Sequence, residues 1–267
     1  MVAGILPPTE GTILRDGRDI KALTGAEARQ MKLRTQMIFQ DPYASLNPRM
    51  RVQDIVGEAP RVHGLLDGAA FDDYVDEQMR RAGLDPTFKR RYPHQFSGGQ
   101  RQRIGIARAL AVKPDFIVCD EAVAALDVSI QAQILAEMKT LAQESGTALI
   151  WISHDLAIVS SLADRVIVLY LGRIVEYGPV SDVLRAPLHP YTRGLLDSLP
   201  ALAAPGQKLM QIPGSTPSPL NVPPGCPFAP RCSHATELCR SEPPGIGDER
   251  HGAFCHHPLN ASGGPNA

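Results

Sequence analysis

Phe-Ile-Val-Cys-Asp-Glu, residues 116–121, is the stretch of sequence that decides the fold. Four apolar residues are followed at once by two carboxylates, Asp120 and Glu121. The apolar part is too short for a typical helix and is rich in large and branched side chains, so it predicts a buried strand. Because ligands of a parallel sheet bind beyond the carboxyl ends of its strands, the two acids mark a candidate site.

Two more apolar runs are followed by polar residues in the same way. Residues 35–39 end at Gln40, and residues 148–152 end at Ser153 and His154. Helical patterns at residues 100–112 and 130–145 separate the runs, and Gly146 is the predicted stop of the second helix. Strands that alternate with helices predict an α/β fold with a mostly parallel sheet.

The remaining sequence predicts three further regions. Residues 50–95 have helical patterns and no comparable strand-forming run, which predicts a helical insert. Residues 166–177 predict a hairpin with a two-residue turn at Gly172 and Arg173. From about residue 186 the chain is rich in proline and contains cysteines, which predicts an appendage with little regular structure.

Composition and charge exclude several classes of protein. The net charge of −1 provides no basic field for nucleic acid, so no nucleic-acid partner is expected. No apolar run approaches the roughly 20 residues that cross a bilayer. Residues 1–7 lack the basic start and long apolar stretch of a signal peptide. We therefore expect a cytoplasmic chain whose membrane contact is made through a partner.

The polar residues at the three predicted strand ends suit phosphoryl transfer. Asp120 can hold Mg²⁺ through its water shell, and Glu121 can orient or deprotonate an attacking water. Gln40 can sense the metal and the water, and His154 can contact the γ-phosphate. Each residue alone would be interpreted as a capping or surface residue. Three strands that end in this way predict a converging site.

A fourth element is the glycine-rich segment Ser97-Gly98-Gly99-Gln100, which directly precedes a predicted helix. Ser97 is a good N-cap, and the two glycines let backbone N–H groups approach a ligand closely. A helix N-terminus also favours an anion. Without the other elements, the segment is equally well interpreted as a plain glycine-rich loop.

In order and spacing, these residues resemble the ABC ATPase family. The loop at Gln40 is similar to the Q-loop of that family, and residues 97–100 are similar to its signature sequence. Residues 116–121 are similar to Walker B with the catalytic Glu. Residues 125–127 resemble the D-loop, and His154 resembles the switch histidine. The resemblance implies a P-loop NTPase-like ABC ATPase core that binds ATP and Mg²⁺. It implies catalytic roles for Glu121, His154 and Gln40. It implies ATP or Mg²⁺ contacts from Gln40, Asp120, Ser97, Gly98, Gly99, Gln100 and Asp127.

Residues 40–49, 92–96 and 187–192 resemble in particular the importers of oligopeptides, dipeptides and nickel. The resemblance covers residues 5–257. It implies an ABC ATPase domain over residues 1–185, with a helical subdomain at about residues 50–110, and an oligopeptide-importer-type C-terminal region over residues 186–267.

The function that this resemblance implies is ATP hydrolysis coupled to uptake of oligopeptides, dipeptides or related substrates such as nickel complexes. The implied partners are a second ABC ATPase subunit in a homo- or heterodimer, two transmembrane permeases and, indirectly, a substrate-binding protein. The implied location is the cytoplasmic face of the inner membrane. ABC proteins of DNA repair or translation are the rival class, but they carry long coiled coils or a second ABC domain, for which this chain has no room.

The sequence departs from the family at the phosphate loop. A Walker A loop needs Gly-x4-Gly-Lys-Ser/Thr, and none of the six lysines in this chain follows a glycine. The expected adenine-stacking aromatic residue is also absent. The sequence is interpreted either as truncated or as a non-hydrolysing subunit that only supplies its signature segment to a partner's ATP site. Ala122 and Ala124, where the family usually has Pro and Ser, remove no catalytic atom.

Four of the five cysteines fall close together near the C-terminus. Cys226, Cys232, Cys239 and Cys255 have the spacing C-x5-C-x6-C-x15-C, looser than common zinc sites. Disulfides, free thiols and a metal site are the three interpretations, and a cytosolic location disfavours disulfides. Four thiolates suit Zn²⁺ or an iron–sulfur cluster, and the family resemblance favours a 4Fe-4S cluster. Cys119 lies in the apolar run and is predicted to be a core residue.

Overall fold

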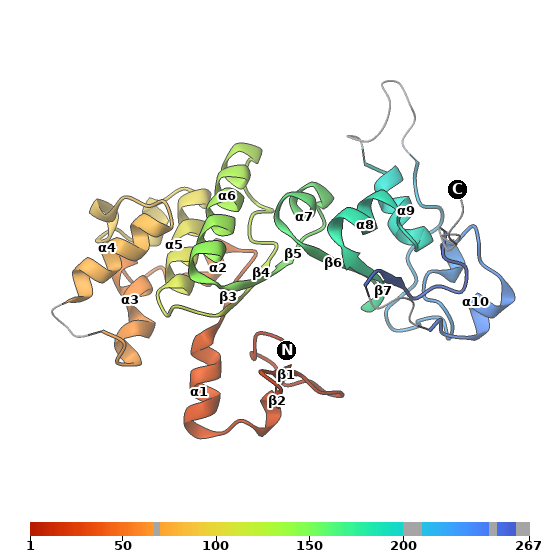
Figure 1. Ribbon diagram of the computed structural model, residues 1–267. Coiled ribbons are helices and arrows are strands. Elements are labelled where there is room, and N and C mark those ends of the chain that lie inside the picture. Colours follow the sequence, from red (N-terminus) through yellow and green to blue (C-terminus); the bar gives the residue numbers. More distant parts are fainter. Residues whose placement is uncertain (67–69, 200–209, 246–249, 260–267) are drawn as a thin grey trace. The chain divides into compact units, whose positions relative to one another are not determined.

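A computed structural model describes residues 1–66, 70–199, 210–245 and 250–259 (Figure 1). The chain divides into two compact units, Met1–Ile158 and Val159–Ala267. This division follows packing and falls within helix α7 (Leu156–Leu162). The expected boundary between functional domains at residue 185 stays a prediction.

The first unit is built on a parallel sheet of order β3-β4-β5. Its strands are β3 (Thr35–Ile38), β4 (Phe116–Asp120) and β5 (Ala148–Ile152), as the three apolar runs predict. Ile38 pairs with Cys119, and Asp120 pairs with Ile152. All three strands therefore end at the same edge of the sheet, which brings the polar residues that follow them together.

Two helices connect these strands, and both begin at a capping residue. Helix α5 (Gly98–Leu110) begins after Ser97, and α6 (Val128–Ser145) begins after Asp127. Helix α6 ends at Gly146, whose φ of 67° is left-handed, so the predicted stop is confirmed. The core of the unit includes Ile104, Ile117 and Ile134, which are each at most 1% exposed.

The helical insert is confirmed. Short helix α2 (Pro42–Ser45) is followed by α3 (Val52–Val62) and α4 (Phe71–Arg81), and α3, α4 and α5 pack on one another (Figure 1). Residues 50–110, apart from the undescribed residues 67–69, contain no strand. Val52, Val56 and Met79 are fully buried there, because the apolar residues of each helix recur on one face.

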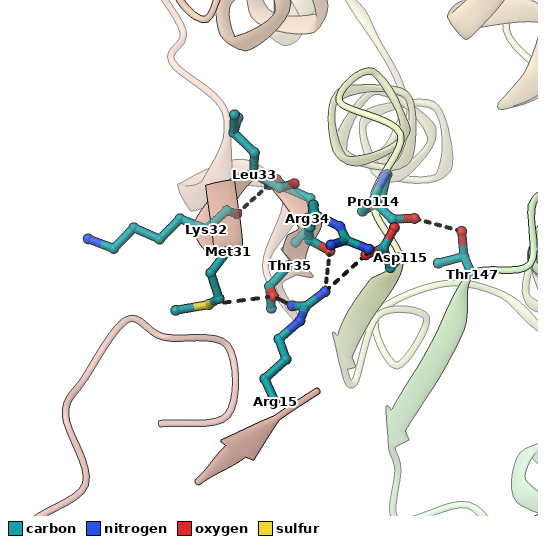
Figure 2. Close-up of polar contacts among 10 residues, drawn as sticks. Arg15, Met31, Lys32, Leu33, Arg34, Thr35, Pro114, Asp115 and Thr147 are labelled. Carbon is teal, nitrogen blue, oxygen red and sulfur yellow. Dashed lines mark hydrogen bonds and ion pairs between the residues drawn. The ribbon is translucent and has the colours of Figure 1, made fainter. Parts of the chain in front are cut away.

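The N-terminal segment is tied to the start of the sheet. Strands β1 (Leu14–Arg15) and β2 (Arg18–Asp19) form a small hairpin, and α1 (Gly25–Arg34) leads directly into β3. Figure 2 shows the Arg15 guanidinium beside Thr35 and Asp115, with Nη2 3.3 Å from Asp115 Oδ2. Arg34 pairs with the same carboxylate. These contacts lie where β3 and β4 begin, at the edge opposite to the polar strand ends.

The second unit contains an antiparallel sheet of order β6-β7-β8. Strands β6 (Arg165–Tyr170) and β7 (Arg173–Pro179) form the predicted hairpin, and β8 (Gly252–Ala253) pairs with β7. The prediction of Gly172 and Arg173 as turn residues is wrong. Tyr170 pairs with Arg173, so the turn is Leu171 and Gly172, with φ of 49° and 73°. Two left-handed residues form the type I′ geometry that matches strand twist.

Beyond the hairpin, the chain has short helices and long irregular segments. The helices are α8 (Val180–Arg185), α9 (Pro190–Asp197) and α10 (Glu237–Ser241). Glu176 is fully buried on β7, and its carboxylate accepts hydrogen bonds from the backbone N–H groups of Leu188 and His189 at 2.8 and 2.9 Å. His189 in turn caps α9. Residues 187–192 therefore anchor the appendage to the hairpin, a role that sequence analysis did not predict.

Candidate nucleotide-hydrolysis site

The structure brings Gln40, Glu121 and His154 together at the carboxyl edge of the parallel sheet. Gln40 Nε2 donates to Glu121 Oε2 at 2.6 Å, and His154 Nδ1 lies 2.9 Å from Glu121 Oε1. The three residues follow three different strands, as predicted. Gln40 and His154 are exposed, whereas the Glu121 side chain is only 26% exposed. A half-buried carboxylate held from both sides is a suitable general base.

Glu121 has a strained backbone. Its φ of 45° lies in the left-handed region, which is uncommon for a residue with a long side chain. Its N–H donates to the carbonyl of Ile152 at 3.0 Å, and its own carbonyl accepts from Ala124 N at 3.0 Å. These bonds fix the residue beside the end of β5. Strain of this kind costs about 1–3 kcal/mol and persists where surrounding structure imposes it, commonly at active sites.

Asp120 stands at the end of β4, next to the three-residue cluster. Its side chain is partly exposed and has no hydrogen-bond or ion-pair partner among the described residues. A free carboxylate at a strand end is chemically suited to Mg²⁺, which prefers carboxylate and water oxygens. The donor set therefore fits the predicted Mg²⁺ role of Asp120.

A small cavity of about 60 Å³ adjoins the cluster. Trp151, Gln131 and Ser153 line it together with Glu121 and His154. Trp151 Nε1 is buried and has no partner in the part of the chain that the structure describes. The cavity has room for a water molecule beside Glu121 and His154. Sequence analysis missed Trp151, because a tryptophan in an apolar run is first interpreted as a core residue.

The signature segment forms a capping box at the start of α5. Ser97 Oγ accepts from Gln100 N at 3.3 Å, and Gln100 Oε1 accepts from Ser97 N at 3.1 Å. A Cβ added to Gly99 would lie 2.8 Å from Ile130 Cγ2, so the lack of a side chain permits close packing on α6. The hydrogen bonds of Ser97 and Gln100 stay within the segment, which the structure does not bring to Glu121.

Asp127 occupies the predicted D-loop position and caps helix α6. Its Oδ1 accepts from Ile130 N at 3.0 Å. The adjacent backbone is fixed by Gln131, whose Nε2 donates to the carbonyl of Val123 at 2.9 Å. The geometry explains Asp127 as a helix cap, and its contact with nucleotide stays a prediction.

The four C-terminal cysteines are free thiols that lie within electrostatic range of one another. The pKa of Cys255 is raised to about 11, chiefly by burial and to a smaller extent by the three other thiols. Burial also raises the pKa of Cys226 and of Cys232. Among the described residues, no three His, Cys, Asp or Glu side chains are grouped so that they could hold a metal ion. This arrangement gives no support to the predicted 4Fe-4S or zinc site. Cys119 is buried in β4, as predicted.

The parallel sheet, the helical insert and the cluster around Glu121 define the core of an ABC-type ATPase. Solved structures of this class are similar. A subunit of the ABC transporter complex cbiONQ from Clostridium perfringens has a TM-score of 0.60 and 29% identity over 68% of this chain and 71% of its own. A dimeric ABC cassette with ADP and phosphate has a TM-score of 0.59 and 28% identity over 67% of this chain and 77% of its own. The fold class is confirmed.

Two family models match the chain. The model "ABC transporter" matches residues 1–124, and the model "Oligopeptide/dipeptide transporter, C-terminal region" matches residues 175–239. A Brucella abortus protein described as a peptide import ATP-binding protein is 49% identical over 96% of this chain and 77% of its own length. The di/tripeptide transport ATP-binding protein DppF of Pseudomonas aeruginosa is 46% identical over 94% of this chain and 78% of its own length. The chain therefore belongs to the ABC transporter ATP-binding proteins, in the oligopeptide/dipeptide branch.

Proposed function

We propose that this protein is the ATPase subunit of an importer that couples ATP hydrolysis to uptake of oligopeptides or dipeptides. The single observation that carries the proposal is the convergence of Gln40 and His154 on the carboxylate of Glu121. The names of the relatives, which describe peptide import, support the substrate class.

In this proposal, Glu121 takes the proton of the attacking water, or orients that water, through the carboxylate that Gln40 and His154 hold in place. His154 is exposed, so its ring is free to reach a γ-phosphate on the open side of the sheet edge. Asp120 would hold Mg²⁺ through its water shell. The metal would supply charge neutralisation for the phosphates.

The assembly that we propose contains a second ABC ATPase subunit and two permeases. In this assembly the signature segment at residues 97–100, whose capping box orders the start of α5, would face the partner ATPase. In the described residues, no helix is long and apolar enough to cross a membrane. Membrane attachment at the cytoplasmic face would therefore run through the permeases.

An ATP site in this assembly would combine the phosphate loop of one subunit with the signature segment of the other. In such a composite arrangement, residues 97–100 of this chain would serve the ATP site of the partner.

We also propose that Cys226, Cys232, Cys239 and Cys255 bind a metal, with a 4Fe-4S cluster favoured over zinc. The basis of this proposal is the type and number of donors, four thiols; the described side chains are not grouped as a preformed metal site. Thiols of raised pKa are protonated at neutral pH, so metal binding would have to displace their protons and reorient the side chains.

The experiment that tests the ATPase proposal uses the chain alone and mixed with an intact ATPase of the same importer class. We expect no ATP turnover by the chain alone and turnover in the mixture that falls when Ser97 of this chain is replaced by Arg. Robust turnover by the isolated chain contradicts the composite arrangement. If turnover in the mixture is unchanged when Ser97 is replaced by Arg, the proposed role of the signature segment is contradicted.

A further inference from the structure

A cavity of about 440 Å³ lies in the second unit. It is bordered by helix α9, by the segment 210–213 and by the turn that contains Phe228 and Arg231. Its volume falls in the range of about 300–1,000 Å³ that small-molecule sites occupy. None of its lining residues belongs to the parallel sheet or to the cluster around Glu121. The cavity is therefore a candidate ligand site built from other residues than the nucleotide site.

One part of the cavity wall is apolar and firmly packed. Phe228 is 3% exposed, and its ring lies against Tyr170 and Tyr191 with centroid separations of 5.3 and 5.4 Å. Ile212 packs closely on α9, because a Cβ added to Gly194 would lie 2.8 Å from Ile212 Cγ1. These contacts form the apolar wall before any ligand arrives, so binding need not pay for ordering it.

Arg231 fixes another part of the wall and brings a positive charge to it. Its Nε donates to the carbonyl of Pro213 at 2.9 Å, and its Nη2 donates to the carbonyl of Ile212 at 3.2 Å. Its Nη1 donates to Thr216 Oγ1 at 3.0 Å and lies 3.4 Å from the Tyr170 hydroxyl. All four acceptors are neutral groups. The charge of Arg231 is thus not neutralised by these partners, and it favours an anionic group in the cavity.

Helix α9 adds charges of both signs to the lining. Arg193 and Asp197 lie one helical turn apart, and both line the cavity. Arg193 Nη1 is 3.8 Å from Asp197 Oδ1, which is longer than a hydrogen bond, and the two side chains are 44% and 39% exposed. An exposed ion pair of this length contributes little to stability, so both side chains can exchange it for a ligand. A ligand that carries both an anion and a cation satisfies both.

We propose that this cavity binds a short zwitterionic peptide, with a dipeptide as the smallest complete ligand. Arg193, close to the charge of Arg231, receives the carboxylate, and Asp197 receives the ammonium group. The apolar side chains of the peptide lie against Phe228 and Ile212. Positions i and i+4 of a helix place Cβ atoms about 5–6 Å apart, comparable with the roughly 7 Å that two extended residues span. The biological meaning of the site rests on the proposed function, because short peptides are what the proposed importer would deliver.

The test is calorimetric titration of the full chain, without nucleotide, with the dipeptide leucyl-leucine. Saturable binding of one dipeptide per chain is expected. N-acetyl-leucyl-leucine lacks the ammonium group, and leucyl-leucinamide lacks the carboxylate. Each should bind at least about tenfold more weakly, because a charge-assisted hydrogen bond is lost. Free leucine should also bind at least about tenfold more weakly, because it has only one apolar side chain to bury.

Matched variants assign each charge to one end of the dipeptide. Asp197→Asn should weaken leucyl-leucine binding at least about tenfold and should not weaken binding of the N-acetyl form. Arg193→Gln should weaken leucyl-leucine binding to a similar extent and should not weaken binding of the amide. Both side chains are exposed, so the variants should fold, which circular dichroism checks. Glu237→Gln and Arg240→Gln are the controls, because this pair on α10, 3.7 Å apart, does not line the cavity. They should leave binding unchanged.

Three outcomes would overturn the inference. They are absence of saturable binding by the folded chain, equal weakening by the α10 control variants, and α9 variants that weaken all forms of the dipeptide alike. Leucine bound as tightly as leucyl-leucine would reject a peptide as the ligand. The ATPase proposal is measured separately, by turnover in the mixture with an intact ATPase. Dipeptide binding without such turnover would keep the site and reject the function, and turnover without dipeptide binding would do the reverse.

Discussion

Gln40 and Glu121 are 81 residues apart in the sequence, yet Gln40 Nε2 lies 2.6 Å from Glu121 Oε2. The bond links the loop that leaves β3 with the end of β4. The other oxygen of the same carboxylate, Oε1, lies 2.9 Å from Nδ1 of His154, which follows β5. One acidic side chain therefore connects the ends of three strands, so a shift of any of these loops changes the environment of the proposed base.

Replacing Glu121 by Gln should preserve nucleotide binding and slow hydrolysis by roughly 10²–10⁴-fold, because the amide cannot accept the proton of the attacking water. The measurement is single-turnover hydrolysis by the chain joined to a phosphate-loop segment, with nucleotide binding measured in parallel. Glu144→Gln, on the exposed face of α6, is the control and should change neither the hydrolysis rate nor nucleotide binding. An unchanged rate would show that Glu121 is not the base.

The strain at Glu121 predicts an unequal effect of two small substitutions. Glu121→Ala and Glu121→Gly both remove the carboxylate, but only glycine accepts the φ of 45° without cost. The glycine variant should be more stable than the alanine variant by about 1 kcal/mol in urea unfolding. Lys113, with φ of 50°, is a matched site and should show the same order. Equal stability of the Glu121 pair would mean that the backbone there is not strained in solution.

The two signature glycines should differ in their tolerance of a methyl group. A Cβ at Gly99 would lie 2.8 Å from Ile130 Cγ2, whereas a Cβ at Gly98 would lie 3.7 Å from Leu126. Gly99→Ala should therefore lower the free energy of unfolding by about 1–3 kcal/mol, and Gly98→Ala by much less. Adding Ile130→Ala should reduce the penalty of Gly99→Ala. Thermal unfolding of Gly98→Ala, Gly99→Ala, Ile130→Ala and the Gly99→Ala/Ile130→Ala double variant tests the contact, which is excluded if the double variant shows no coupling.

The second unit should lose stability in mild acid. Burial lowers the pKa of His189 to about 4, while the unfolded chain has an ordinary histidine pKa near 6.5. Below pH 6.5 only the unfolded state takes up this proton, so the contribution is complete above pH 6.5 and is lost as pH falls toward 4. The loss is at most about 1.4 kcal/mol per pH unit. His189→Asn keeps a capping acceptor for Tyr191 N, and its urea unfolding should depend less on pH between 7 and 5. An identical pH dependence would contradict the prediction.

The metal proposal is tested on anaerobically purified protein. Iron, sulfide and broad visible absorption are expected, and Cys232→Ser or Cys239→Ser should abolish the absorption and expose the C-terminal region to protease. Cys119→Ala is the control, because Cys119 lies in β4. One equivalent of zinc without iron would reject the cluster and keep a metal site. Four freely reactive thiols in folded protein without metal would reject both.

Local sequence patterns were sufficient to predict the three parallel strands, the helical insert and the polar residues at the strand ends. Each of these features depends on a few neighbouring residues: an apolar run, its length and the residues directly after it. The hairpin was also predicted, but not its turn. Leu171 adopts a left-handed φ that its side chain disfavours, because the pairing of Tyr170 with Arg173 imposes it.

Only the tertiary structure decided which side chains come into contact with one another. The sequence alone determined that Gln40, Glu121 and His154 follow apolar runs. The parallel register of β3, β4 and β5 placed all three within hydrogen-bonding distance. The burial of Glu176, the cavity beside Trp151, the spacing of the four thiols and the cavity beside α9 likewise depend on contacts between residues far apart in the chain. Such contacts are set by packing and strand register, which local patterns constrain only in part.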